Sequence, residues 1–423
     1  MRNLSLLILA ALLAMVLWAI LVFTGARHGW WHADPGPRED VASFFSTSVA
    51  ALDTAGQGAV AFVLIEKGKV FGEHYVSAGT PLSRDTLFQL ASLSKWATAL
   101  GVLKLAADGK LDLDAPVSRY LTRWQLPETE YDADGVTARR LLSHTAGLTD
   151  GLGYMGFEKG TPVQTLEASL TAAADPMPGA DGRTRIGLAP GSAWSYSGGG
   201  YALLQLLIEE TSGEAFGDYM KRVVFDPLGM SHATFDLAAA EAAGLAPCFD
   251  AEGAPCTYRN FAAPSAASLH ASAADLTRFL EAQMEGAGDP ALPPGLAADM
   301  RAPHASQFGL PIWGLGVMLY ADAPGGGYII GHEGMNFPAI ETTARLDPAT
   351  GDGIIVLTTG NPGLAATLGG EWVYWHAGRV DVRQIDGMLP AIGLALLAGW
   401  AVILALAVLA LRRMRRSKTP AAS

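Results

Sequence analysis

The longest uninterrupted apolar stretches of the sequence lie at its two ends. Residues 4–25 and 387–411 give runs of 22 and 25 residues without a charged side chain. Because a helix rises about 1.5 Å per residue, each run is long enough to cross a hydrocarbon core of about 30 Å. We therefore predict transmembrane helices over residues 1–25 and 387–411, with residues 26–386 exported. Aromatic residues near both segments are expected interfacial anchors: Trp30, Trp31, Trp372, Tyr374 and Trp375.

The segment after the second apolar run is basic. Residues 412–423 include Arg412, Arg413, Arg415, Arg416 and Lys418. Since cationic loops stay preferentially inside, we expect a cytoplasmic tail, and two spans then place both termini in the cytoplasm. This topology predicts a protein of the cell inner membrane with a periplasmic, extracytoplasmic domain. A cleaved signal peptide is the alternative for the first run, although it exceeds the usual length of about 7 to 15 residues and no clear small-x-small site follows.

The region between the apolar ends has the pattern of a mixed α/β domain. Apolar runs predict a strand pair over residues 59–66 and 69–76, and helical spacing predicts helices over 92–108, 201–211 and 275–286. Further strand-like runs lie at 313–320, 328–332, 339–346 and 353–359, with turn residues between them. We predict an antiparallel sheet flanked by helices and interrupted by an α-rich insert over about 112–265.

Composition and charge narrow the classes of function. Half of the residues are hydrophobic and only 17% are charged, which is too apolar for a disordered or purely soluble chain. Without Arg2 and the five cations of the tail, the exported part has 23 basic and 41 acidic residues, a net charge near −18. Such a surface repels phosphate backbones, so we expect no nucleic-acid partner.

The two cysteines are close in sequence. Cys248 and Cys256 flank a segment in which Asp250, Glu252 and Gly253 suggest a turn. In an oxidising compartment we expect a local disulfide, which the chain-entropy model values at about 2 to 3 kcal/mol; two free thiols are the alternative. No spacing of Cys and His residues indicates a zinc or other metal site.

A Ser-x-x-Lys motif marks the candidate chemistry. In Phe88-Gln-Leu-Ala-Ser-Leu-Ser-Lys95, Ser92 and Lys95 are three residues apart at the predicted start of a helix, so both side chains lie on one face. A serine hydroxyl is a weak nucleophile until a base takes its proton, and a lysine amine can do this when its pKa is lowered. The chain contains eight lysines and no other match to this motif.

Five other short segments accompany the Ser-x-x-Lys motif in a characteristic order along the chain. They are Asp85-Thr-Leu-Phe88, Asp108-Gly-Lys-Leu-Asp-Leu-Asp-Ala-Pro-Val117, Leu141-Leu-Ser-His-Thr-Ala-Gly-Leu148, Pro190-Gly-Ser-Ala-Trp-Ser-Tyr-Ser197 and Gly331-His-Glu-Gly334. With these motifs residues 45–375 resemble the penicillin-recognising serine hydrolases: class C β-lactamases, D-alanyl-D-alanine carboxypeptidases and their esterase relatives. The resemblance implies the β-lactamase/transpeptidase-like α/β fold and a serine hydrolase that needs no metal or cofactor.

The resemblance also implies roles for individual residues. Ser92 matches the nucleophile that accepts the acyl group, Lys95 its amine partner, and Tyr196 the phenol of the Tyr-x-Asn element. Whether Lys95 or Tyr196 is the base stays open. His332 and Gly334 match the third, substrate-binding element, which is Lys-Thr-Gly in many lactamases. The backbone N–H groups of Ser92 and Met335 would form the oxyanion hole.

Two departures from the family pattern bear on specificity. Gly198 stands where the family has an asparagine, so amide recognition would be weaker, or supplied by Asn336 or another group. His332 replaces a lysine, and a neutral imidazole holds a substrate carboxylate less strongly. Both changes favour an esterase or a peptidase of altered specificity over a strict lactamase. We interpret three other residues of the domain as structural: His144, His270 and Asp275.

These observations predict a membrane-anchored serine hydrolase that cleaves an ester or amide through an acyl-enzyme on Ser92. Its expected partners are membrane lipid around the two helices and a small-molecule, peptide or cell-wall substrate. The alternative is a sensor that is acylated once, or that binds peptidoglycan fragments, without turnover. The sequence leaves the acyl group, the leaving group and the oligomeric state open.

Overall fold

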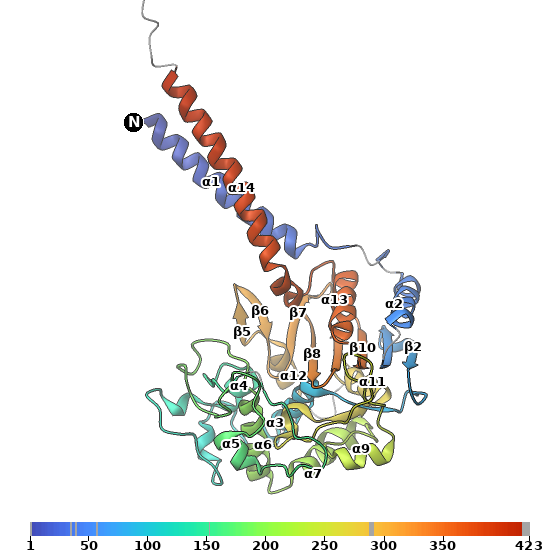
Figure 1. The fold of residues 1–423 in the computed structure, drawn as a ribbon. Coiled ribbons are helices and arrows are strands. Elements are labelled where there is room, and N and C mark those ends of the chain that lie inside the picture. The colour runs from blue at the N-terminus through green and yellow to red at the C-terminus, as the bar shows by residue number, and fades with distance from the viewer. Residues whose placement is uncertain are drawn as a thin grey trace, which may run out of the picture.

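Two long terminal helices project together from a single α/β domain (Figure 1). The computed structural model describes residues 2–33, 36–38, 40–55, 58–151, 153–286 and 292–416. Helices α1 (Arg2–Arg27) and α14 (Val382–Arg416) lie side by side along their length. The indole of Trp18 donates to the carbonyl of Ala395 at 3.0 Å, and that of Trp400 donates to the carbonyl of Met15 at 3.1 Å.

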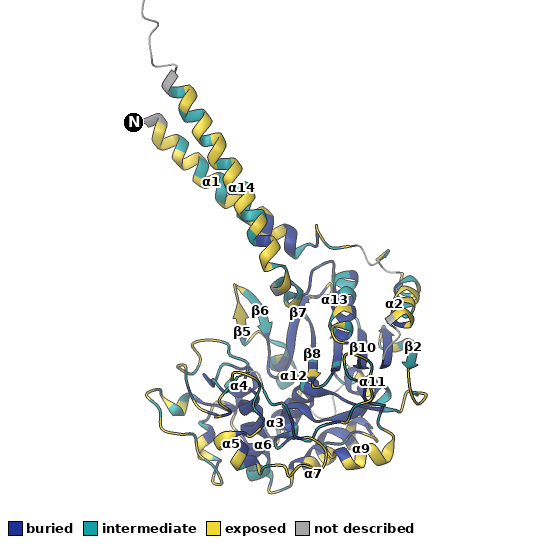
Figure 2. Ribbon diagram, in the orientation of Figure 1, coloured by how far each residue is buried: buried dark blue, intermediate teal, exposed yellow. Residues whose placement is uncertain are grey.

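The terminal helices have the length and composition of membrane spans. Leu4–Arg27 and Gly387–Met414 are apolar over at least 18 residues, and only 6% and 0% of those windows are buried. Core helices of a soluble domain would be mostly buried, whereas these are exposed along most of their surface (Figure 2). The two helices therefore indicate membrane anchoring. Residues 417–423 of the predicted basic tail, Lys418 among them, lie outside the described residues.

An eight-stranded antiparallel sheet forms the centre of the domain, which confirms the predicted fold class. The strands follow the order β2-β1-β10-β9-β8-β7-β6-β5, so the first hairpin joins the last strand. Their bounds are β1 Ala59–Glu66, β2 Lys69–Ser77, β5 Ala305–Gln307, β6 Leu310–Trp313, β7 Met318–Asp322, β8 Tyr328–Asn336, β9 Ile340–Asp347 and β10 Asp352–Thr359. A separate pair comprises β3 Leu87–Gln89 and β4 His270–Ser272.

The sheet is buried on both faces, as the alternation along β1 shows. Ala61 and Val63 point into a core shared with α3 (Ser94–Ala107) and α11 (Ala273–Glu281). Phe62 and Leu64 point into a second core, shared with α2 (Val41–Ala55) and α13 (Leu364–Ala377). Because both sets of side chains are apolar, this strand reads as a continuous apolar run in the sequence.

The segment between α3 and β4 is helical, as predicted for residues 112–265. Its α-helices are α4 Ala138–Leu142, α5 Leu166–Ala172, α6 Gly198–Ser212, α7 Phe216–Met220, α8 Asp226–Leu228, α9 Leu237–Ala243 and α10 Pro264–Ala267, with a π-helical turn at Lys221–Phe225 and 3₁₀ turns at Val117–Arg119 and Ala133–Gly135. Helix α12 (Pro294–Arg301) precedes the last strands.

Two sequence-based expectations are wrong. The predicted strand over 313–320 is two strands, because a turn at Gly314 and Gly316 separates β6 from β7. Gly316 has φ 77°, and a Cβ atom there would lie 2.2 Å from that of Ala99. Trp372 and Trp375 are not interfacial anchors: both lie buried on α13, against the second core. Trp30 and Trp31 are exposed beside the end of α1.

Ion pairs join both terminal helices to the sheet. At the start of α14, Asp381 pairs with Arg345 of β9, and neither side chain is exposed. The same guanidinium contacts Glu333 of β8. Arg27, the last residue of α1, pairs with Asp322 of β7 at the surface. The base of the helix pair is therefore fixed to strands of the α/β domain.

Candidate active site

Ser92 lies in a tight turn that leads into α3. The turn is a 3₁₀ segment, η1 (Ala91–Leu93), and Ala91 has φ 48°, a left-handed conformation that L-residues seldom adopt. The hydroxyl of Thr342 donates to the carbonyl of Leu90 at 2.7 Å and helps to hold the turn. A Cβ atom at Gly334 would lie 2.2 Å from that carbonyl oxygen. Gly334 is therefore required for β8 to approach the nucleophile turn.

Lys95 is buried one helical turn beyond Ser92. Its Nζ donates to Ser92 Oγ at 3.1 Å and to the carbonyl of Ala266 at 2.6 Å. The same nitrogen lies 5.0 Å from the ring centre of Tyr196 and 5.4 Å from that of Tyr201. The amine thus has one direct partner that can react, the serine hydroxyl, and is otherwise surrounded by a carbonyl and aromatic faces.

Tyr196 is positioned by the beginning of α6. Ser197 is the N-cap of this helix: its Oγ accepts from Gly200 N at 2.8 Å and bonds to the buried carboxylate of Asp150. Asp150 also accepts from Gly199 N at 2.6 Å, so its carboxylate holds both the Ser197 hydroxyl and the Gly199 N–H at the start of the helix. Burial raises the pKa of Asp150. Sequence reasoning missed this residue, because no local pattern links it to position 197.

The ring of Tyr196 packs on His144. Their ring centres are 4.3 Å apart, and His144 Nδ1 accepts from Ser197 N at 3.1 Å. Burial, with the nearby charge of Lys95, lowers the pKa of His144 well below its usual value. A neutral imidazole is thus available to accept that hydrogen bond, and the contacts are those of a supporting residue.

The three predicted catalytic side chains line one cavity of about 360 Å³. Its wall combines the nucleophile turn, the loop before α6, and the end of β8, including Ser92, Lys95, Tyr196, Gly334, Met335 and Asn336. Met335 is 75% exposed and follows Gly334 on the strand edge beside Ser92. The Asn336 amide nitrogen donates to Gln89 Oε1 and to the carbonyl of Ala267, both at 3.0 Å, which leaves its carbonyl oxygen for a substrate N–H.

His332 lies behind this cavity rather than in its wall. The residue is fully buried, and its ring centre is 5.4 Å from that of Trp313. Burial, reinforced by the charge of Lys95, lowers the pKa of His332 to about 3. The imidazole is therefore neutral at pH 7. Besides Lys95, the described residues place a second cation in the cavity lining: Arg383, whose guanidinium is 3.8 Å from Glu333.

Tyr154 occupies the space beside Gly198. A Cβ atom at Gly198 would lie 2.8 Å from Gly153 Cα and 3.2 Å from the ring of Tyr154. Tyr154 lines the catalytic cavity, and burial raises the pKa of its phenol. The position where the family pattern has an amide side chain is thus bordered by a neutral phenol from a distant loop. No periodic pattern or motif in the sequence points to Tyr154.

The remaining sequence candidates lie outside the cavity. His270 is buried on β4, and burial lowers its pKa to about 4. Asp275 forms the capping box of α11 with Ser272. Cys248 and Cys256 are joined in a disulfide with Cα atoms 5.0 Å apart. Among the described residues, no three His, Cys, Asp or Glu side chains are arranged to hold a metal ion.

Comparison with known proteins identifies the relatives of this domain. Residues 45–378 match the model of the Beta-lactamase family. The chain belongs to the beta-lactamase family. It is 34% identical over 165 residues to Penicillin-binding protein 4* of Bacillus subtilis and 35% identical over 170 residues to Esterase EstB of Burkholderia gladioli. Those alignments cover 38% and 37% of this chain but only 33% and 41% of the two relatives.

Solved structures of the beta-lactamase family share the fold. An octameric penicillin-binding protein homologue from Pyrococcus abyssi superposes with a TM-score of 0.65 at 23% identity, covering 79% of this chain and 77% of its own. A beta-lactamase/D-alanine carboxypeptidase from Pseudomonas syringae superposes with a TM-score of 0.61 at 17% identity, and the match covers 77% of this chain and 96% of that protein. The family includes serine hydrolases of several substrate classes, and these identities establish the common architecture alone.

Proposed function

We propose that this protein is a membrane-anchored serine hydrolase that cleaves an ester or amide through an acyl-enzyme on Ser92. The observation that supports the proposal is the contact of 3.1 Å between Ser92 Oγ and Lys95 Nζ, in one cavity with the phenol of Tyr196. A hydroxyl beside an amine and a phenol has two neighbours able to exchange its proton.

The reaction proceeds in two half-reactions. Ser92 Oγ attacks the substrate carbonyl carbon while its proton passes to Lys95 or Tyr196, and the tetrahedral oxyanion is bound by the backbone N–H groups of Ser92 and Met335. The leaving group takes the proton, and the carbonyl re-forms as an acyl ester of Ser92. Water then attacks the carbonyl carbon of this ester and gives up a proton to the same pair. The bond to Ser92 Oγ breaks, that proton passes to Ser92 Oγ, and the acid is released. His144 and Asp150 act as positioning residues for Tyr196.

The proposed location follows from the helices and the tail. Both α1 and α14 cross the inner membrane, the termini are cytoplasmic, and the catalytic domain faces the periplasm. The disulfide between Cys248 and Cys256 is compatible with an oxidising compartment.

Fluorophosphonate labelling of the full-length chain in detergent tests the proposal. We expect stoichiometric labelling at Ser92 and turnover of p-nitrophenyl butyrate, with Ser92→Ala losing about a thousandfold or more of the activity. Ser46→Ala, at an exposed serine of α2, is the matched control and should keep both the labelling at Ser92 and the turnover of the ester. One equivalent of product without further release would instead identify a sensor that is acylated once. An unlabelled, inactive wild-type protein would refute the hydrolase.

A further inference from the structure

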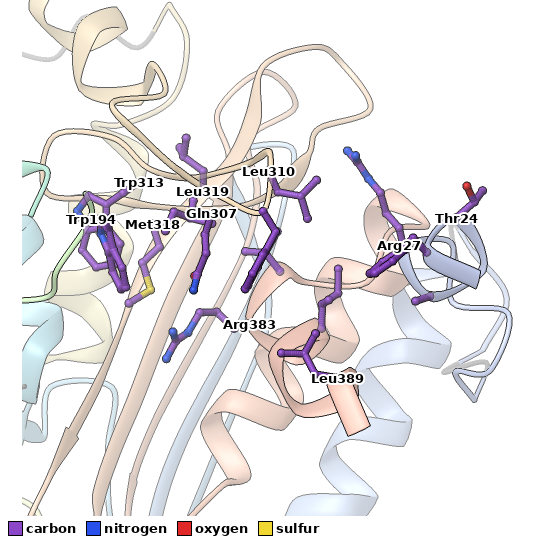
Figure 3. A pocket seen from close by; sticks show the side chains of 16 residues that line it. Thr24, Arg27, Trp194, Gln307, Leu310, Trp313, Met318, Leu319, Arg383 and Leu389 are labelled. Atoms are coloured by element: carbon purple, nitrogen blue, oxygen red, sulfur yellow. The ribbon is translucent and has the colours of Figure 1, made fainter. Parts of the chain in front are cut away.

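A second cavity, of about 500 Å³, lies between the membrane helices and the catalytic domain (Figure 3). Its volume is within the range of about 300 to 1,000 Å³ that is typical of ligand sites. The walls come from the end of α1, the start of α14, the β5–β6 hairpin, the start of β7 and Trp194 of the loop before α6. The lining is largely apolar and includes Phe23, Ile385, Leu389, Leu310 and Ile312.

Residues of α1 and α14 form one end of this cavity. Phe23 and Leu389 lie within the two apolar segments long enough to span a bilayer, and both side chains are exposed on the helix pair. Phe308, at the tip of the β5–β6 hairpin, also lines the cavity and is 80% exposed. Since exposed apolar side chains on membrane helices contact lipid, this end of the cavity lies at the bilayer surface.

The other end adjoins the catalytic cavity. Four residues line both cavities: Trp194, Trp313, Met318 and Arg383. Figure 3 shows Trp194, Trp313 and Met318 on one side of the apolar cavity and Thr24 and Arg27 on the other, with Leu310 between them and Leu389 below Leu310. A molecule that occupies both cavities therefore extends from the bilayer surface to the cavity that holds Ser92.

The chemistry of the lining selects among substrates. A sugar or peptide in this cavity would bury many polar groups against a mainly apolar lining, in which few side chains, such as Thr24, Gln307 and Trp194, can form hydrogen bonds, and this is costly. A hydrocarbon chain has no such groups, and its burial is favourable. The cationic side chains in the lining, Arg27 and Arg383, contact Asp322 and Glu333. The cavity therefore suits an alkyl chain better than a cell-wall peptide.

The helix wall of the cavity is held in place. Val382 and Ile385 follow directly on Asp381, whose buried ion pair with Arg345 fixes the start of α14 to β9. The site is thus part of the folded domain, and it forms only when both the helices and the sheet are present.

We propose that the substrate is a single-chain amphiphile drawn from the bilayer, whose alkyl chain lies in this apolar cavity while its ester or amide reaches Ser92. The inference rests on the proposed function and specifies its substrate class. It predicts that catalytic efficiency, expressed per substrate free in water, increases with chain length, by up to about fourfold for each methylene that leaves water for the bilayer and the cavity.

The test uses the full-length chain in lipid nanodiscs. Two substrate series are compared at one lipid concentration: p-nitrophenyl esters from acetate to decanoate, and alkyl acetates from ethyl to decyl. We expect kcat/KM to rise with chain length in at least one series. Leu310→Trp fills the cavity and should lower the decanoyl-to-acetyl ratio of kcat/KM at least tenfold. Leu188→Trp, also at a partly exposed leucine but outside the residues lining either cavity, should keep the wild-type ratio.

The possible outcomes distinguish the proposal of a serine hydrolase from the proposal of an amphiphilic substrate. A wild-type protein that labels at Ser92 but shows no chain-length preference in either series overturns the amphiphile and leaves the hydrolase standing. An equal loss of the ratio in Leu310→Trp and Leu188→Trp overturns the assignment to this cavity. If Leu310→Trp fails to label, Leu389→Trp takes its place, with the exposed Leu397→Trp as control. Failure of the wild type to label at Ser92 refutes both proposals.

Discussion

Gly198 shows how a single position shapes this active site. The family pattern has an amide side chain here, but the adjacent space holds the backbone of Gly153 and the ring of Tyr154. The volume of that side chain is therefore occupied by the ring of Tyr154, whose phenol has a pKa raised by burial.

Filling the space at Gly198 should damage the site. We expect Gly198→Ala to lower the free energy of unfolding by about 1 to 3 kcal/mol, because its Cβ would displace Gly153 or Tyr154, and to reduce fluorophosphonate labelling of Ser92. Thermal unfolding and the labelling rate of the full chain measure both effects.

Gly217 offers the matched control. It also lies in the first turn of a helix, and nothing stands within 4 Å of a Cβ atom there, so Gly217→Ala should be neutral or slightly stabilising. If Gly198→Ala and Gly217→Ala have the same free energy of unfolding and the same labelling rate, the close packing beside Gly198 does not stabilise the site.

The residues of the site differ in how far the sequence predicts them. Ser92 and Lys95 are one helical turn apart, so their contact follows from local spacing, and the surrounding motifs pointed to Tyr196. Asp150 and Tyr154 come from a loop with no periodicity, and their partners are 47 and 44 residues further along the chain. Only the folded structure brings these residues to the site.

At the scale of helices and strands, the membrane helices form a defined pair. Gly399 of α14 faces the indole of Trp18, and a Cβ atom there would lie 2.0 Å from Trp18 Nε1. Small residues at helix interfaces allow such close approach, and the two indole hydrogen bonds to carbonyls add directionality.

A larger side chain at Gly399 should separate α1 from α14. We insert a protease site between residues 34 and 35, cleave the chain in detergent, and measure how much of the α1 fragment copurifies with the remainder. Gly399→Leu should lower the retained fraction severalfold, because the indole of Trp18 is displaced.

Gly393 is the control for this experiment, because nothing lies within 4 Å of a Cβ atom at that position. Gly393→Leu should retain the α1 fragment like the wild type. If Gly399→Leu retains it equally well, the close approach of the two helices does not hold the pair together.

Most strands and the main helices follow from the sequence because their burial is regular. The exceptions arise from tertiary contacts. The break between β6 and β7 depends on the approach of Gly316 to Ala99, and α13 buries Trp372 and Trp375 against a sheet that the sequence alone does not place beside them. An aromatic cluster near a membrane span has the same composition whether it faces lipid or a protein core.

At the scale of the whole molecule, one buried ion pair connects the membrane part to the active-site strands. Asp381 contacts Arg345, and Arg345 contacts Glu333, which lines the catalytic cavity. Removing one partner leaves the other charge buried, whereas an exposed pair such as Arg27 with Asp322 contributes little.

These two pairs predict a contrast between matched variants. Asp381→Ala should lower the free energy of unfolding by about 3 to 5 kcal/mol, and Asp322→Ala by less than about 1 kcal/mol. Thermal unfolding in detergent measures both, and the double variant Arg345→Met with Asp381→Leu should recover part of the loss. Similar values for Asp381→Ala and Asp322→Ala would contradict a structural role for the buried pair.

The sheet order also has a consequence for biogenesis. Strand β1 pairs with β10, so residue 60 finds its partner at residue 358, and β8, which borders Ser92, is also made late. A nascent chain emerging from the translocation machinery therefore exposes an open edge on β1 until nearly all of the domain has been synthesised. Under the proposed function and topology, a partly translocated polypeptide has no assembled site around Ser92, and hydrolysis would begin only in the compartment where translocation of the domain is completed.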